Sequence, residues 1–224
     1  MDILYLALLV AAAASMIASA SVNSTFDKYN KQMSTTGMTG ETAAKRILEM
    51  AGIHDVTVKP ISGKLTDHYN PGSKQLCLSE AVYYSSSVAA IGVAAHECGH
   101  AVQHAYGYGP LRMRSALVPV VNFASNIVQW VLLAGILLIN VFPSLFLIGI
   151  LMFATTTLFS FITLPVEINA SSRAISWLTQ AGITDGQTRP MAIDALKWAA
   201  YTYVVAALGS LATLFYYIGI ARRD

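Results

Sequence analysis

The sequence has little charge and few cysteines, and both shortages exclude whole classes of protein. Only 12% of the 224 residues are charged whereas 55% are hydrophobic, which is too apolar for a soluble domain of this size. The net charge is +2 and the cations are scattered, so nucleic acid is not expected as a partner. Cys77 and Cys98 could form at most one disulfide, which excludes a disulfide-rich secreted scaffold, and we expect both to be reduced.

Charged side chains are absent from long stretches, and these stretches predict membrane spans. Residues 3–20 are uncharged and long enough to cross a bilayer once. Their small-residue end resembles a signal-peptidase site, but Asp2 stands where a signal peptide has Lys or Arg, so retention is favoured over cleavage. Residues 115–166 contain no Asp, Glu, Lys, Arg or His and as one helix would be about 78 Å long, so they must fold back.

The reversal is expected at residues 140–144, because Pro143 disfavours a helical residue before it and lacks a backbone donor. This leaves spans near 117–139 and 144–164. A further uncharged run, 198–221, carries tyrosines toward its ends as interfacial aromatic residues would be. The predicted fold class is therefore a mainly α, four-span integral membrane protein with a small α+β domain in its polar part.

The positive charges predict how the chain is oriented. Twelve Lys and Arg residues lie in the polar segments 21–116 and 167–197, and only Arg222 and Arg223 lie elsewhere. The positive-inside tendency then puts the polar segments in the cytoplasm and both termini outside. We expect a multi-pass protein of the plasma membrane.

Together, the uncharged runs and the polar segments divide the chain into five consecutive parts. These are a first span (1–20), a polar domain (21–114), a transmembrane hairpin (115–166), a polar helical segment (167–197), and a last span with a basic tail (198–224).

Within the polar domain, residues 21–38 lack any periodicity and are interpreted as a linker. A helix is expected from about Thr39 to Gly52, strands at 56–58 and 75–79, and turns at 67–72. Ser79 is expected to cap one long helix over residues 80–106. Further helices are expected over 167–181, with Gly182 as the stop, and from Thr188.

The predicted long helix carries His96-Glu97-Cys98-Gly99-His100, which matches the HExxH pattern. Two His four residues apart lie on one helix face, where both imidazoles can reach a single Zn²⁺, and Glu97 beside them can take a proton from the metal-bound water. Cys98 points away and is interpreted as a packing residue. Because the pattern fixes only three positions, a chance match is the alternative.

A catalytic zinc needs a third protein ligand and an open position. His104 lies about 12 Å along the helix axis from His96, too far to share an ion without a helix break, so we expect an outer or surface histidine there. Glu167 is favoured as the ligand because it is the first ionisable residue after the uncharged stretch, and two spans return it to the side of His100. The alternative is an interfacial Glu stabilised by a helix N-terminus.

The chain resembles the bacterial YugP-type membrane zinc metallopeptidases over nearly its whole length. The segments that carry the resemblance are Asp67-His68-Tyr69-Asn70-Pro71, residues 93–104 around the HExxH motif, residues 114–119, and Leu164-Pro165-Val166-Glu167. The chain also resembles, more distantly, the gluzincin membrane proteases, in which HExxH is followed by a membrane hairpin and a second helix bearing Glu.

This resemblance implies His96, His100 and Glu167 as ligands of one Zn²⁺ and Glu97 as the general base. The distant group often has Asp four residues after its ligand Glu, where this chain has Ser171. Ser171, Asn169 or a residue elsewhere would then hold a zinc-bound histidine in place of that Asp.

The predicted function is peptide hydrolysis by a membrane-embedded zinc metalloendopeptidase whose active site faces the cytoplasm. The expected partners are a protein or peptide substrate, including unfolded or membrane proteins, and the lipid bilayer; self-association is left open. Strand 75–79 could pair with an extended peptide, although an ordinary sheet is favoured. Arg173, His68 and Tyr106 are unranked candidates for the donor to the oxyanion.

Two other functions stay open. The first is a zinc-binding membrane protein with a structural or interaction role and no proteolysis; Glu97 discriminates, because a closed four-ligand site has no use for a general base. The second is a hydrolase of another amide or of a lipid within the bilayer. Asn122, Asn126 and Gln129 on the second span fit such a hydrolase but fit interhelical hydrogen bonds better.

Overall fold

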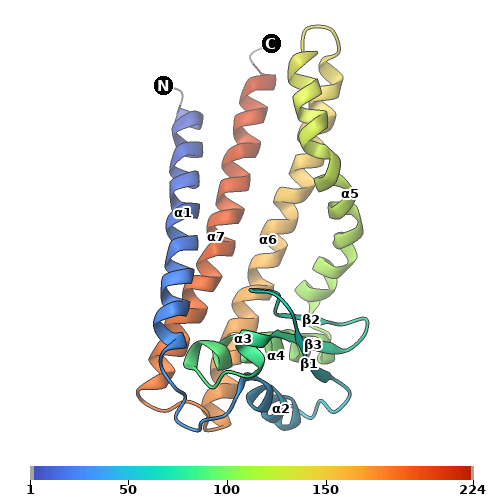
Figure 1. Ribbon diagram of the computed structural model, residues 1–224. Coiled ribbons are helices and arrows are strands. Elements are labelled where there is room, and N and C mark those ends of the chain that lie inside the picture. The colour runs from blue at the N-terminus through green and yellow to red at the C-terminus, as the bar shows by residue number, and fades with distance from the viewer. Residues whose placement is uncertain (1–2, 223–224) are drawn as a thin grey trace.

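Seven helices and one three-stranded sheet form residues 3–222, the part of the chain that the computed structural model describes (Figure 1). In chain order the elements are α1 (Ile3–Asn30), α2 (Gly40–Met50), β1 (Thr57–Ile61), β2 (His68–Asn70), β3 (Gln75–Ser79), α3 (Glu80–Tyr83), α4 (Val88–Ala105), α5 (Gly109–Leu137), α6 (Pro143–Gln180) and α7 (Thr188–Ala221). The chain is mainly helical, as predicted. Within residues 3–222, the four helices α1, α5, α6 and α7 are long and apolar enough to cross a membrane, which agrees with the predicted number of spans.

The long helices run side by side, and the sheet with α2, α3 and α4 gathers at one end of them (Figure 1). Helix α6 packs against both α5 and α7, and α1 packs against α7. The beginning of α1 and the end of α7 lie at the opposite end from the sheet (Figure 1). The polar elements are therefore collected in a single layer at one end of the long helices (Figure 1).

The hairpin between α5 and α6 turns where the sequence predicts it. Helix α5 ends at Leu137, and Pro143 stands in the first turn of α6, where its missing N–H leaves no helical bond unmade. Helix α6 then continues without a break to Gln180, so the predicted helix over residues 167–181 is the last part of α6. It stops at Gly182, whose φ of +65° favours glycine, as expected.

The interpretation of residues 21–38 as a linker is wrong for its first part, because residues 21–30 continue α1. Their helix is held by contacts that no local pattern reveals. Thr25 and Tyr29 are buried, and the Tyr29 hydroxyl donates a hydrogen bond of 2.8 Å to Asp194 Oδ2 on α7. Tertiary packing against α7 thus overrides the weak local preference of this segment.

The prediction of one helix over residues 80–106 is also wrong, because the helix is interrupted between Tyr83, the last residue of α3, and Val88, the first residue of α4. Ser79 is the N-cap residue of the short helix α3, but its side chain makes no capping bond; its hydroxyl donates to Asp67 Oδ2 at 3.1 Å. Ser87 instead caps α4, and its Oγ accepts from the Ala90 N–H at 3.1 Å. Serine side chains offer the backbone such alternatives to a helical bond, so the break falls at the serine run 85–87.

The sheet has the order β1-β3-β2, with β3 parallel to β1 and antiparallel to β2. Strand β2 forms within the segment in which the sequence predicted only turns. Since β3 is central, both of its edges are occupied, and the favoured interpretation of residues 75–79 as an ordinary sheet strand is confirmed. Leu76 and Leu78 of β3 are fully buried in the core that the sheet shares with α2 and α4.

Candidate metal centre

Helix α4 crosses α6 at a distance that only glycine allows. A Cβ added at Gly99 would lie 2.6 Å from the backbone oxygen of Ala170, whereas a Cβ at Gly92 of the same helix would meet nothing within 4 Å. Real Cβ atoms do not approach a carbonyl oxygen so closely. Gly99, inside the HExxH motif, therefore lets α6 pass directly against α4 and brings Glu167 to the two histidines.

Three side chains converge at this crossing. His96 Nε2 and His100 Nε2 lie 3.2 Å and 3.6 Å from the same atom, Glu167 Oε2. The imidazole rings are nearly perpendicular, with centroids 4.8 Å apart, and the donor atoms of the three residues all lie within 4.8 Å of one another. This grouping of His96, His100 and Glu167 is the one that the sequence motif and the topology predicted.

The three residues fit a zinc ion in both chemistry and spacing. Imidazole nitrogens and a carboxylate oxygen are ligands that zinc accepts, and two His with one Glu leave a fourth position open for water, as in catalytic sites. Ligand atoms about 2.0–2.1 Å from a tetrahedral zinc lie about 3.3 Å from one another. The distances from Glu167 Oε2 to the two imidazoles, 3.2 Å and 3.6 Å, lie on either side of this value.

The outer nitrogen of each imidazole is held by a polar side chain. His96 Nδ1 lies 3.1 Å from Ser171 Oγ, and His100 Nδ1 lies 3.0 Å from Gln103 Oε1. The fully buried Gln103 also donates through Nε2 to the Val166 oxygen and to Asn169 Oδ1, at 2.8 Å and 3.0 Å.

These bonds fix the histidine tautomer. Because the Gln103 amide nitrogen is committed to two acceptors, its oxygen must accept from the His100 Nδ1–H, which leaves His100 Nε2 as a free lone pair. Ser171 stands where the sequence led us to expect a substitute for Asp, and it does contact a histidine. Asn169, the other candidate, contacts Gln103 instead. The signal for Gln103 was its position one turn after His100 on the same helix face, and the sequence analysis missed it.

Glu167 is only 2% exposed and its second oxygen is also bound. Arg114 at the beginning of α5 donates through Nη1 to Glu167 Oε1 at 3.0 Å. The two carboxylate oxygens thus face different partners, one the imidazoles and the other a guanidinium. Burial lowers the pKa of His100, but hydrogen bonding to Glu167 and the nearby charge of Glu97 more than offset it, and the pKa lies above its ordinary value.

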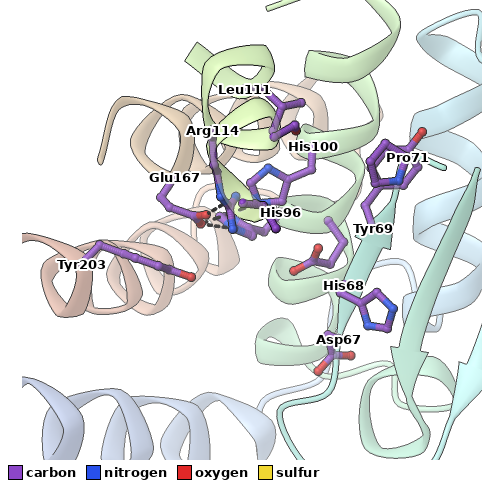
Figure 2. A pocket seen from close by; sticks show the side chains of 13 residues that line it. Asp67, His68, Tyr69, Pro71, His96, His100, Leu111, Arg114, Glu167 and Tyr203 are labelled. Atoms are coloured by element: carbon purple, nitrogen blue, oxygen red, sulfur yellow. Dashed lines mark hydrogen bonds and ion pairs between the residues drawn. The ribbon is translucent and has the colours of Figure 1, made fainter. Parts of the chain in front are cut away.

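The three residues open onto a pocket of about 420 Å³ (Figure 2). One wall comes from β2 and the residues beside it: Asp67, His68, Tyr69 and Pro71. The facing wall comes from α5 and α7: Leu111, Arg114, Ser115, Val118 and Tyr203. Glu97 also lines the pocket and is 9% exposed. Within residues 3–222, no side-chain hydrogen bond engages its carboxylate, which leaves it available to a molecule in the pocket.

The remaining candidates from the sequence fall outside the metal group. His104 bonds the Tyr69 hydroxyl through Nδ1 at 2.9 Å, as suits the outer position expected of it. Cys98 is buried, its Sγ faces the Ala44 oxygen, and both cysteines are free. These observations agree with a packing role for Cys98 and with the expected reduced state.

Of the three candidates for an oxyanion donor, only His68 lines the pocket. Tyr106 donates to the backbone oxygen of Ala51, and Arg173 donates to Asn169 Oδ1. Neither residue lines the pocket. The pocket brings in Arg114 and Tyr203 instead, which the sequence analysis did not single out for the site.

Comparison with known proteins gives two matches. The family described as "Putative neutral zinc metallopeptidase" matches residues 4–222. A protein of Bacillus subtilis (strain 168) named "Putative membrane protease YugP" is 45% identical over 199 residues, which cover 89% of this chain and 88% of that protein. No solved structure matches the chain.

Proposed function

The chain belongs to this metallopeptidase family, and from that premise we propose that it is a membrane-embedded zinc endopeptidase with Glu97 as its general base. The observation that carries the proposal is the convergence of His96, His100 and Glu167 on one point at the floor of a pocket. The adjoining carboxylate of Glu97 faces the same pocket. A purely structural zinc site would have a fourth protein ligand and no need for a carboxylate of this kind.

In the proposed mechanism His96, His100 and Glu167 hold one Zn²⁺. When bound, the ion would polarise the scissile carbonyl and lower the pKa of the attacking water toward neutrality. Glu97 accepts the proton of that water as it attacks, and then delivers the proton to the nitrogen of the departing amine. One carboxylate thus serves in turn as base and as acid.

The surrounding residues keep this arrangement rigid. Gln103 and Ser171 bond the outer nitrogens of the imidazoles, so neither ring can turn its inner nitrogen away. Arg114 engages the outer oxygen of Glu167, which directs the other oxygen at the histidines. Because Arg114 is on α5 and Glu167 on α6, this ion pair also couples the site to the transmembrane hairpin.

We further propose that the long helices span the plasma membrane with the pocket on the cytoplasmic side. Large exposed apolar side chains on α5, such as Phe123, Trp130 and Leu137, support a bilayer around the helices. The Lys and Arg content of the polar layer supports the cytoplasmic side. The pocket lies where α5 enters its apolar part, which favours protein substrates, unfolded or membrane-bound, that reach the membrane surface.

The test is cleavage of an unfolded protein such as reduced casein by the full-length protein in detergent or nanodiscs. The wild type should cleave, a chelator should stop cleavage, and added Zn²⁺ should restore it. Glu97→Gln should retain zinc but lose at least roughly 100-fold in kcat, because proton transfer by a positioned carboxylate contributes about that much or more. A zinc-loaded wild type that cleaves no peptide bond, or full activity in Glu97→Gln, would contradict the proposal.

A further inference from the structure

The pocket contains a tyrosine that no step of the proposed mechanism uses. Tyr203 of α7 lines the pocket together with Glu97 and Glu167, although it lies far from both in the sequence. As a whole residue, Tyr203 is 38% exposed. Figure 2 shows the ring extending from its helix with the hydroxyl end directed into the pocket on the side of Glu167.

The Tyr203 hydroxyl is close enough to the carboxylates of Glu167 and Glu97 to interact electrostatically with both. A phenol in such a place can donate a hydrogen bond but carries no charge at neutral pH. It therefore stands beside the point where the proposed zinc ligands converge, as a donor that does not compete for the metal.

Peptide hydrolysis needs a donor of this kind. As water attacks, the scissile carbonyl oxygen becomes negatively charged. A hydrogen-bond donor directed at that oxygen stabilises the charge in the transition state and contributes strongly to catalysis. The donor must reach the oxygen while Glu97 handles the water, and Tyr203 sits next to both Glu97 and the metal-binding group.

The Tyr203 hydroxyl interacts with Glu167, whereas the other long polar side chains that line the pocket are engaged elsewhere or on the other carboxylate oxygen. Arg114 is bound to Glu167 Oε1, and the Tyr69 hydroxyl is bound to His104. His68 Nδ1 lies 2.7 Å from the Thr66 oxygen, and its ring belongs to the opposite wall. Among these side chains, Tyr203 is the one with a hydroxyl directed at the metal-binding group from the wall of the long helices (Figure 2).

We propose that Tyr203 is a further catalytic residue, whose hydroxyl donates a hydrogen bond to the scissile carbonyl oxygen as that oxygen gains charge. This inference rests on the proposed function. The Tyr203 proton stays on its own oxygen throughout, and Glu97 carries the proton from water to the amine. When the C–N bond breaks, the carbonyl double bond re-forms and the hydrogen bond weakens.

The test is Tyr203→Phe in the full-length protein, with Tyr201→Phe on the same helix as the matched control. Tyr201 is 40% exposed, contacts Trp198, and does not line the pocket. Tyr203→Phe should lower kcat about 100-fold with little change in KM, because it removes one donor to a developing oxyanion. Tyr201→Phe should match the wild type.

A second readout does not depend on turnover. In the zinc-loaded Glu97→Gln background, a phosphinic peptide, whose tetrahedral centre carries charged oxygens, should bind Tyr203→Phe roughly 10- to 100-fold more weakly than the tyrosine form. The uncleaved substrate peptide should bind both forms equally. Zinc content should be the same in both.

Unchanged kcat together with unchanged phosphinic-peptide binding would overturn the role of Tyr203. Loss of zinc in Tyr203→Phe would also overturn it, because the hydroxyl would then act by positioning Glu167. Both outcomes leave the endopeptidase proposal intact, since the wild type would still bind zinc and cleave. A wild type without zinc or cleavage would instead refute the proposed function itself.

Discussion

The two ends of the bundle of long helices are held together in different ways. At the end with the sheet, polar side chains, which include Gln103, Ser171 and Arg114, tie α6 to its neighbours in addition to the apolar core. At the far end, α5 and α6 are joined by an apolar cluster made up of Val128, Leu132, Phe146 and Ile150. The first kind of contact fixes individual atoms, and the second fills space.

Both ends nevertheless depend on a glycine at the closest backbone approach. A Cβ on Gly135 would lie 2.6 Å from the Cα of Phe146, just as a Cβ on Gly99 would lie 2.6 Å from the Ala170 oxygen. The same steric device thus serves two purposes. An apolar contact can absorb a small shift at a modest cost, whereas a metal site needs its ligands within about 0.5 Å. Substitutions at the two ends should therefore differ in what they destroy.

The largest effect on metal binding is expected from Gly99→Ala. Its methyl group would force α4 away from α6 and separate Glu167 from the histidines, so zinc affinity should fall by at least roughly 100-fold, as for a lost ligand contact. The control is Gly92→Ala on the same helix, where the added Cβ meets nothing within 4 Å. Zinc titration of both full-length variants measures this difference. Equal zinc affinities would show that the close contact of α4 and α6 at Gly99 is not needed to bring the ligands together.

A smaller loss is expected from Gln103→Leu. The change leaves His100 Nδ1 and the Val166 oxygen without their partner while keeping most of the side-chain volume. Zinc affinity should fall by about 10- to 100-fold, and unfolding should become easier by about 1–3 kcal/mol because buried polar groups are left unpaired. Competition with a chelator and thermal unfolding measure the two effects. Wild-type stability and wild-type zinc affinity in this variant would show that a residue other than Gln103 determines the tautomer of His100.

Ser171→Ala should weaken zinc binding by about 10-fold. This is the lower end of the range, about 10- to 100-fold, that is typical for loss of a side chain that orients a histidine ligand. Within the described residues 3–222, the Ser171 hydroxyl bonds only the outer nitrogen of His96, and water can take over part of that role. Ser172→Ala next to it, on an exposed position of α6, is the control and should bind zinc as the wild type does. The same chelator competition applies, and equal loss in both variants would contradict a specific role for Ser171.

The smallest effect on zinc is expected from Gly135→Ala at the far end. Overpacking against Phe146 should destabilise the hairpin by about 1–3 kcal/mol, while zinc affinity stays at the wild-type value. Gly209→Ala on α7 provides the contrast, because its added Cβ would be 3.7 Å from the Ala11 side chain and should cost nothing. Thermal unfolding and zinc titration separate the two quantities. Loss of zinc in Gly135→Ala would mean that the two ends are coupled.

Much of this fold could be predicted because the strongest signals are local. Uncharged runs give the long helices, Pro143 gives the reversal between α5 and α6, and Gly182 gives the end of α6. The helical residues 21–30 could not be predicted, since they depend on contacts with a segment far away in the sequence. The Tyr29–Asp194 bond, for example, joins α1 to α7, which lie 165 residues apart at this contact. The break between α3 and α4 had a local signal, the serine run 85–87, which the prediction of one long helix overlooked.

The residues of the site also fall into two groups, those that the sequence predicts and those that only the folded structure reveals. His96, Glu97 and His100 are given by a motif, and Glu167 by its isolation after an uncharged stretch and by the parity of the spans. Gln103 is marked only by its position one turn after His100, and Arg114 and Tyr203 have no local signal. Arg114 is one of 14 cations and Tyr203 one of 11 tyrosines, and only the packing of α4, α5 and α7 around α6 singles them out.

We propose that His96, His100 and Glu167 hold one zinc ion beside Glu97, and the zinc content of purified wild type, Glu167→Ala and Glu97→Gln tests this arrangement. About one zinc per chain is expected in the wild type and in Glu97→Gln, and loss of zinc is expected in Glu167→Ala. Zinc that is absent from the wild type, or fully retained in Glu167→Ala, would contradict it.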